Sequence, residues 1–336
     1  MRHHIAFCLF FAVAGCSASA VDEPPLAAEN TETPETAMSS VEAMSEILAQ
    51  NPVDEAALVQ RGNELFQGGA VDEAIQDYTA ALAVKDNAQT HYNRAVAYTA
   101  KNDFVQALAD YTAAIKLSPS DSSPYFNRGV VLHKVGKTAE GIQDLSEAIK
   151  LDPRDANSPL NRGLLYLAIG LNDRAIEDFD SALKINPKLL DAYINRGFAY
   201  HVRGDYDQAI KDFSEAVAIS PKGALAHSNR GNSYSKQGKL DLALKDLDEA
   251  VTLEFNDPQI YNNRGTIHGA RGAHGKAVAD FTRAIELAPE FAPAFRNRAA
   301  AYHQLGNVAQ AQEDYSTALR LDPDGVELIP EQYRRK

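Results

Sequence analysis

Two charged columns recur through this sequence at a fixed distance from each other. An Arg stands sixteen residues before an Asp, and this arrangement occurs eight times. The planar guanidinium group of Arg matches a carboxylate through two parallel hydrogen bonds. The spacing therefore predicts a ladder of ion pairs, with the alternative that each Arg binds the carboxylate of a ligand. The columns are Arg61, Arg94, Arg128, Arg162, Arg196, Arg230, Arg264 and Arg298, and Asp77, Asp110, Asp144, Asp178, Asp212, Asp246, Asp280 and Asp314.

An Asn directly precedes seven of these arginines. Asn is a mediocre helix former, so its return within an expected helix needs a reason. Its side chain offers one acceptor and two donors, which complement one peptide group. The column is a candidate for peptide binding, with the alternative that each amide bonds only within its own scaffold. Its members are Asn93, Asn127, Asn161, Asn195, Asn229, Asn263 and Asn297.

Other patterns that resemble catalytic or metal sites are incomplete. Segment 269–277 is rich in Gly and contains Gly-Lys, but it has Ala270 where a phosphate loop needs its first Gly and Ala277 where the loop needs Ser or Thr. His133, His201 and His303 occupy one position in different repeats, so separate layers would hold them. A regular array brings no catalytic set into one pocket. We therefore expect no catalytic residue, no metal site and no cofactor.

Composition and charge narrow the class of protein. The chain has 336 residues, 45% hydrophobic and 24% charged, which is typical of soluble proteins. Its net charge is −13 without a local basic patch, which argues against a nucleic-acid partner. Both cysteines, Cys8 and Cys16, lie in the first sixteen residues, so we expect no disulfide in the folded body.

The N-terminus has the pattern of a cleaved signal. The apolar run at 5–15 is too short to span a bilayer and has the length of a signal-peptide core. Its end, "VAGC", resembles the lipobox of bacterial lipoproteins, which implies that signal peptide 1–15 is removed and that Cys16 carries lipid. The alternative is an ordinary secretory signal cut near 17–20. Ser17 rather than Asp follows the cysteine, which by the same resemblance favours the periplasmic face of the outer membrane.

The segment after this cysteine is acidic and contains no Lys or Arg. Residues 16–38 have several prolines and no apolar repeat, so they predict a disordered tether that holds the body away from the membrane. We expect order to begin at Ser39, whose spacing to Glu42 fits a capping box. An N-terminal capping helix is predicted within 39–54.

The rest of the chain has a period of 34 residues. The Asn column returns at this interval, and one earlier copy, with Gln60, is one residue shorter. Such a period is typical of helix–turn–helix arrays. Two helical patterns flank a turn in each period, which predicts an all-α solenoid of about eight units, followed by a short tail at 326–336. The units are 55–87, 88–121, 122–155, 156–189, 190–223, 224–257, 258–291 and 292–325.

Columns of small residues and closing prolines resemble the tetratricopeptide repeat (TPR) family. The first unit departs from the pattern because it ends at Asp86 without a proline, and the sixth has Phe255 with Pro258 three residues late. We expect an altered joint at both places. The matching positions are Gly62, Ala95, Gly129, Gly163, Gly197, Gly231, Gly265 and Ala299 in the first helix, Ala74, Ala107, Gly141, Ala175, Ala209, Ala243, Ala277 and Ala311 in the second, and Pro119, Pro153, Pro187, Pro221, Pro289 and Pro323 at the end.

The resemblance implies a right-handed superhelix whose first helices line a concave groove. In the peptide-binding superhelix of O-linked N-acetylglucosamine transferase, an Asn ladder grips a peptide backbone, and the Asn column here has the corresponding place. The residue before each Asn is apolar in the second to fifth units and polar in the next two, which predicts an apolar front to the groove.

We therefore expect a non-enzymatic scaffold in the bacterial envelope that binds protein or peptide partners. Roles in cell-wall, pilus or secretion assembly fit the resemblance. One alternative is a structural homodimer formed through exposed end faces, because little sequence remains to cover the last unit. The other is an enzymatic or glycosyltransferase-associated role.

Overall fold

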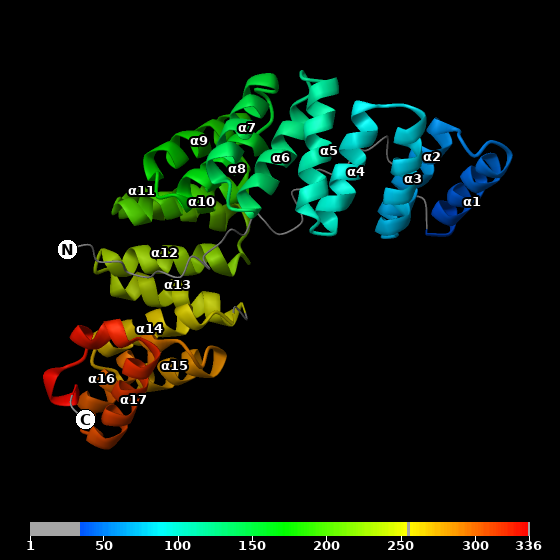
Figure 1. Cartoon of the computed structure of the whole chain (residues 1–336). Coiled ribbons are helices and arrows are strands. Elements are labelled where there is room, and N and C mark those ends of the chain that lie inside the picture. Colours follow the sequence, from blue (N-terminus) through cyan, green and yellow to red (C-terminus); the bar gives the residue numbers. More distant parts are fainter. Residues whose placement is uncertain (1–33, 254–255, 335–336) are drawn as a thin grey trace. The chain divides into compact units, whose positions relative to one another are not determined.

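The computed structural model describes residues 34–253 and 256–334, and within these ranges it is all-α (Figure 1). After α1 (Pro34–Gln50), helices come in pairs joined by tight turns. The pairs are α2 (Glu55–Gln67) and α3 (Val71–Val84), α4 (Ala88–Ala100) and α5 (Phe104–Leu117), α6 (Ser122–Lys134) and α7 (Thr138–Leu151), α8 (Asn157–Ala168) and α9 (Asn172–Ile185), α10 (Leu190–Arg203) and α11 (Tyr206–Ile219), α12 (Ala224–Lys236) and α13 (Leu240–Thr252), α14 (Pro258–Ala270) and α15 (His274–Leu287), and α16 (Ala292–Gln304) and α17 (Val308–Leu321).

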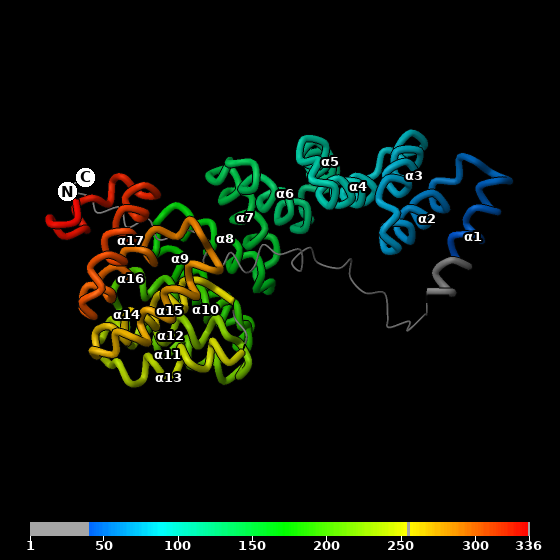
Figure 2. Tube along the Cα trace, turned by 90° about the horizontal axis from the view of Figure 1, so that it is seen from below, coloured from blue at the N-terminus to red at the C-terminus, as the bar shows by residue number. Residues whose placement is uncertain are grey.

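The chain divides into two compact units, Met1–Asn195 and Arg196–Lys336, with the division inside α10. In the described part of the first unit, each helix from α1 to α9 packs against the next (Figure 2). The same holds from α11 to α17 in the second unit. Within each unit the first helices of neighbouring pairs also touch, as α4 touches α2 and α6, and α14 touches α12 and α16. This arrangement confirms the predicted fold class, an all-α solenoid of helix pairs.

A close contact inside each pair explains the small residue that follows the Arg. A Cβ atom added to Gly197 would lie 2.8 Å from Cε1 of Phe213, a ring that is completely buried. An aromatic ring presses on the equivalent glycine in three further pairs. These contacts are Gly62 with Tyr78, Gly163 with Phe179, and Gly265 with Phe281. The small residue is thus a packing requirement that offsets the helix propensity lost by using Gly.

The turn inside each pair uses a left-handed backbone conformation. Gly204 has a φ of 91°, and glycine stands at this place in seven of the eight pairs. Asn102 takes the place in the remaining pair with a φ of 60°, and Asn is among the residues that tolerate this region.

The N-terminal helix begins earlier than its sequence predicted. Helix α1 starts at Pro34, so Ser39 and Glu42 both lie inside it and form no capping box at its start. Proline suits the first turn of a helix because its φ is already near the helical value. Leu48 of α1 is buried in one cluster with Leu58 of α2. Signal peptide, Cys16 and the tether up to residue 33 lie outside the described residues.

Altered joints were expected after the first and the sixth unit, and the structure describes the first more fully than the second. At the first, the ring of His91 lies 2.8 Å from the carboxylate of Asp86, which stands where other units have a closing proline. At the second, Phe255 lies outside the described residues, and Pro258 occupies the first turn of α14.

The C-terminal tail covers the last pair, contrary to expectation. It forms two short 3₁₀ helices, η1 (Pro323–Leu328) and η2 (Glu331–Tyr333). Ile329 and Tyr333 are buried, and the ring centroid of Tyr333 lies 4.8 Å from that of Tyr315 on α17. The tail therefore shields apolar surface that would otherwise be exposed at this end, and the end-face argument for a homodimer loses its basis here.

Candidate functional site

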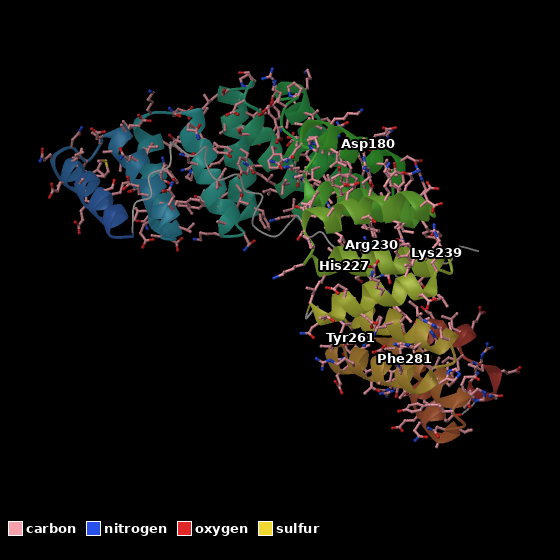
Figure 3. All side chains as sticks on the ribbon, turned by 180° about the vertical axis from the view of Figure 1, so that it is seen from behind. Asp180, His227, Arg230, Lys239, Tyr261 and Phe281 are labelled. Atoms are coloured by element: carbon pink, nitrogen blue, oxygen red, sulfur yellow. The ribbon has the colours of Figure 1, made fainter. Side chains whose placement is uncertain are left out.

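The Arg and Asp columns form ion pairs within the helix pairs. This is the predicted ladder, and the alternative was that each Arg is free to bind a ligand carboxylate. Arg230 of α12 (Figure 3) donates from Nε to Oδ2 of Asp246 at 2.7 Å and from Nη2 to Oδ1 at 2.8 Å. All eight pairs repeat this bidentate geometry. The Asp side chains are buried, so each carboxylate depends on its guanidinium for compensation.

The electrostatics agree with a scaffold role for these arginines. The hydrogen bond to Asp246 raises the pKa of Arg230, while partial burial acts in the opposite direction. A raised pKa on the cation means that the folded protein stabilises its charged form.

A second acceptor, found for seven of the eight guanidinium groups, was not anticipated from the sequence. Nη1 of Arg230 donates to Oγ of Ser214 at 3.2 Å, on the second helix of the preceding pair. Arg264 makes the same bond to Asp248 at 2.9 Å. The signal was present, because Ser, Thr or Asp stands two residues after every Asp of the ladder. The other acceptors of this kind are Ser45, Thr79, Thr112, Ser146 and Thr282.

The Asn column divides by exposure. Asn93, Asn263 and Asn297 are partly exposed. The remaining four are buried, with exposed fractions of 4–7%. A buried amide reaches a ligand only if its side chain or its neighbours move. The buried members are Asn127, Asn161, Asn195 and Asn229.

Several of these amides cross-link neighbouring first helices. Asn93 donates to Oδ1 of Asn63 at 2.9 Å and accepts from Gln89 at 2.8 Å. Asn127 donates to the hydroxyl of Tyr92 at 2.8 Å. In the second unit, Asn263 and Asn297 donate to Asn232 and Asn262 of the preceding first helix. The bonds join α4 to α2, α6 to α4, α14 to α12 and α16 to α14.

Two other members bond to their own helix. Asn161 donates to the carbonyl of Asn157 at 2.9 Å, and Asn195 to the carbonyl of Asp191 at 2.7 Å. These bonds give the amides the scaffold role that was the alternative to peptide binding. Binding of a peptide by the column stays a prediction.

Three of the four apolar residues before the Asn column are buried, and only Tyr92 is partly exposed. Phe126, Leu160 and Ile194 are all at most 8% exposed. They fill the space between helices, because side chains at this position point into the stack. The expectation of an apolar front is therefore wrong for Phe126, Leu160 and Ile194.

The histidines lie in scaffold contacts rather than in a shared site. Nδ1 of His201 lies 2.9 Å from Oγ of Ser233, and burial lowers the pKa of His201 to about 4, with a further contribution from Lys236. His227 of α12 (Figure 3) lies 3.0 Å from the carbonyl of Pro221. Within the described residues, no three His, Cys, Asp or Glu side chains come together as a metal site.

The buried ion pair yields a stability prediction. We expect Asp246→Ala to lower the free energy of unfolding by about 3 kcal/mol, because it leaves Arg230 without its buried counter-ion. Glu249→Ala, at an exposed position of the same helix, is the matched control and should change stability by less than about 0.5 kcal/mol. Urea denaturation followed by circular dichroism measures both. Equal losses for the two variants would contradict a structural role for the pair.

His201 yields a pH prediction. Its folded-state pKa of about 4 lies below the ordinary value of 6.5, so the unfolded chain takes up the proton first as pH falls. The stability that neutral His201 contributes is complete above pH 6.5 and is lost between pH 6.5 and 4, at up to about 1.4 kcal/mol per pH unit. His201→Gln should lose less stability over this window. Parallel pH profiles of the urea midpoint for the two proteins would contradict the assignment.

Family profiles match most of the chain. A profile described as TPR repeat matches residues 62–101, 97–136, 163–202 and 199–238. Two profiles described as tetratricopeptide repeat match residues 122–155, 224–257, 258–291 and 292–324. No curated protein sequence matches the chain.

Solved structures share the fold. A tetratricopeptide repeat protein from Parabacteroides merdae is 21% identical with a TM-score of 0.56, covering 76% of this chain and 98% of its own. PilW, described as a widely conserved type IV pilus biogenesis factor, is 22% identical with a TM-score of 0.55, covering 60% and 94%. PilF of Pseudomonas aeruginosa is 14% identical with a TM-score of 0.53, covering 60% and 92%. With eight helix pairs in series and these matches, the chain belongs to the tetratricopeptide repeat family.

Proposed function

We propose that this protein is a non-enzymatic scaffold of the bacterial envelope, anchored by lipid on Cys16, that binds protein or peptide partners along its first helices. The observation that carries the binding role is the contact between successive first helices, which places equivalent side chains side by side within each unit. Proteins of this family bind protein or peptide partners. An array of this kind presents one extended surface, whereas a catalytic pocket needs convergent groups.

The partly exposed amides are the first candidates for partner contacts. Asn93 and Asn263 each sit in a short chain of amides that begins at a Gln and ends at the preceding first helix. Such a chain holds the amide in one orientation, which lowers the entropy lost when a partner binds. Donors and acceptors of a peptide backbone would extend these chains rather than replace them.

The envelope location is supported by the N-terminal sequence. An apolar run of eleven residues leads directly to Cys16 in a lipobox-like setting. None of the helices in the described part of the chain combines the length and apolar content needed to cross a bilayer. Attachment through several acyl chains would hold the protein stably, whereas one chain binds only marginally.

A labelling experiment tests the anchor. In a bacterial host grown with radioactive palmitate, we expect the full chain to carry label and to sediment with membranes. Cys16→Ser should abolish the label, because the cysteine thiol is the acceptor. Cys8→Ser is the matched control and should keep the label, since it lies within the segment that is removed. Label that persists in Cys16→Ser would refute lipid attachment at this residue.

A capture experiment tests the binding surface. Immobilised wild-type chain is compared with a variant carrying Asn93→Ala, Asn263→Ala and Asn297→Ala, using solubilised envelope proteins and quantitative mass spectrometry. We expect specific partners to fall several-fold in the variant, because three partly exposed amides are lost. A matched control carries Gln67→Ala, Gln106→Ala and Gln304→Ala at exposed positions. Equal partner recovery from variant and wild type would contradict a binding role for these amides.

A further inference from the structure

Helix α1 has the structural role of a second helix in an incomplete repeat. Oγ of Ser45 accepts a hydrogen bond from Nη1 of Arg61 at 3.2 Å, which is the bond that Ser214 accepts from Arg230 in a complete pair. Pro52 stands three residues before α2, where later units have their closing prolines. The chain therefore builds half a repeat before its first complete one.

The face of α1 that a first helix would cover is only partly buried. Ser40, Met44 and Ile47 stand 34 residues before Ala74, Tyr78 and Ala81. Those three residues of α3 are at most 1% exposed, partly because α2 of the same pair covers them. Ile47, in contrast, is 41% exposed. Among the described residues, α1 packs only against α2.

The ladder Asp is also absent from this half repeat. Ala43 is exposed at the position where every complete pair has its buried Asp. A helix that docks here thus needs no Arg at the ladder position, and α1 offers it small and apolar side chains instead. We call Ser40, Ala43, Met44 and Ile47, together with Glu64 of α2, the α1 face.

Glu64 adds a polar requirement to this surface. Its Oε1 accepts a hydrogen bond from Oγ of Ser40 at 2.5 Å, but its Oε2 is buried without a hydrogen-bond partner in the described structure. The equivalent position in the sixth pair is Ser233, which bonds to His201 of the preceding first helix. Oε2 therefore lacks the kind of partner that a preceding first helix supplies. An unpaired carboxylate oxygen is costly, so a donor from a ligand would be favoured.

Charge decides what kind of ligand fits. Between residues 3 and 84 the only Lys or Arg is Arg61, and it is bonded to Asp77. Glu42 and Glu46 of α1 are exposed. The segment that precedes α1 in this chain is itself acidic and contains Pro24 and Pro25, so it supplies no cation for Glu64. Charge complementarity favours a basic segment from another protein.

We infer that the α1 face is a docking site for a basic amphipathic helix of a partner protein, which completes the half repeat. The helix would place a small residue against Met44, as Gly62 lies against Tyr78, and an apolar side chain against Ile47. A Lys or Arg of the helix would bind Oε2 of Glu64 once the Glu64 side chain turns outward, because this atom is buried in the free protein. Apart from Glu64 of α2, this site is separate from the surface of the first helices that carries the proposed function.

The test uses a defined probe and the full-length chain in mild detergent. The probe is a fluorescent fourteen-residue amphipathic peptide with a Leu/Ala face, a central Gly and four Lys, and its match carries Glu in place of Lys. Fluorescence anisotropy should show binding of the Lys peptide and none of the Glu peptide. Ile47→Ser and Glu64→Gln should each weaken binding about tenfold, equivalent to about 1.4 kcal/mol. Ile185→Ser, at a similarly exposed Ile of α9, is the matched control and should leave binding unchanged.

Three outcomes would overturn the inference. The first is equal binding of the Lys peptide to wild type and to Ile47→Ser or Glu64→Gln. The second is tight binding only after deletion of residues 21–33, which would mean that the chain covers this face itself. The third is a wild-type dimer that Ile47→Ser converts to a monomer, which would identify a second copy as the occupant. Asn93→Ala should not alter peptide binding, so failure of the proposed function is distinguishable from failure of this site.

Discussion

The array of helix pairs depends on the hydrogen bonds of the guanidinium group of the repeated Arg. Two of its nitrogens hold the buried Asp of its own pair, as in Arg128 with Asp144, and the third reaches Thr112 on the preceding pair. A buried carboxylate without a cation would be strongly unfavourable. One side chain thus stabilises the fold within a repeat and sets the register between repeats. Repeat proteins are stabilised by interactions of this kind, within one repeat and between neighbouring repeats.

Hydrogen bonds within the scaffold also limit which side chains of the first helices are free to bind a partner. Most amides of the Asn column already donate to a neighbouring helix or to their own backbone, as Asn127 does to Tyr92 and Asn195 to Asp191. Buried polar groups in a helical stack need hydrogen-bond partners. Side chains that look free to bind a ligand in the sequence are therefore already hydrogen-bonded to neighbouring helices in the structure. Amides with remaining exposure, such as Asn93, are those with another amide beside them.

The two ends of the described helical array differ in how their apolar faces are covered. At the C-terminus, Ile329 and Tyr333 fold back onto the last pair and His303 bonds the hydroxyl of Tyr333 at 2.8 Å. At the N-terminus, α1 covers α2 but leaves Ile47 exposed and Oε2 of Glu64 without a partner in the described structure. The chain's own apolar side chains cover the last pair, whereas part of α1 stays exposed at the start of the described array.

Sequence alone was sufficient for the repeat length, the helix pairs and the Arg–Asp pairing. All of these depend on helical periodicity and on spacing within one repeat, such as the sixteen residues between Arg196 and Asp212. Only the tertiary structure decided the partners of the Asn column, the acceptor for the third guanidinium nitrogen and the folding back of Tyr333. These depend on side chains from a neighbouring repeat or segment, and the choice among several geometrically possible partners is made when helices pack together.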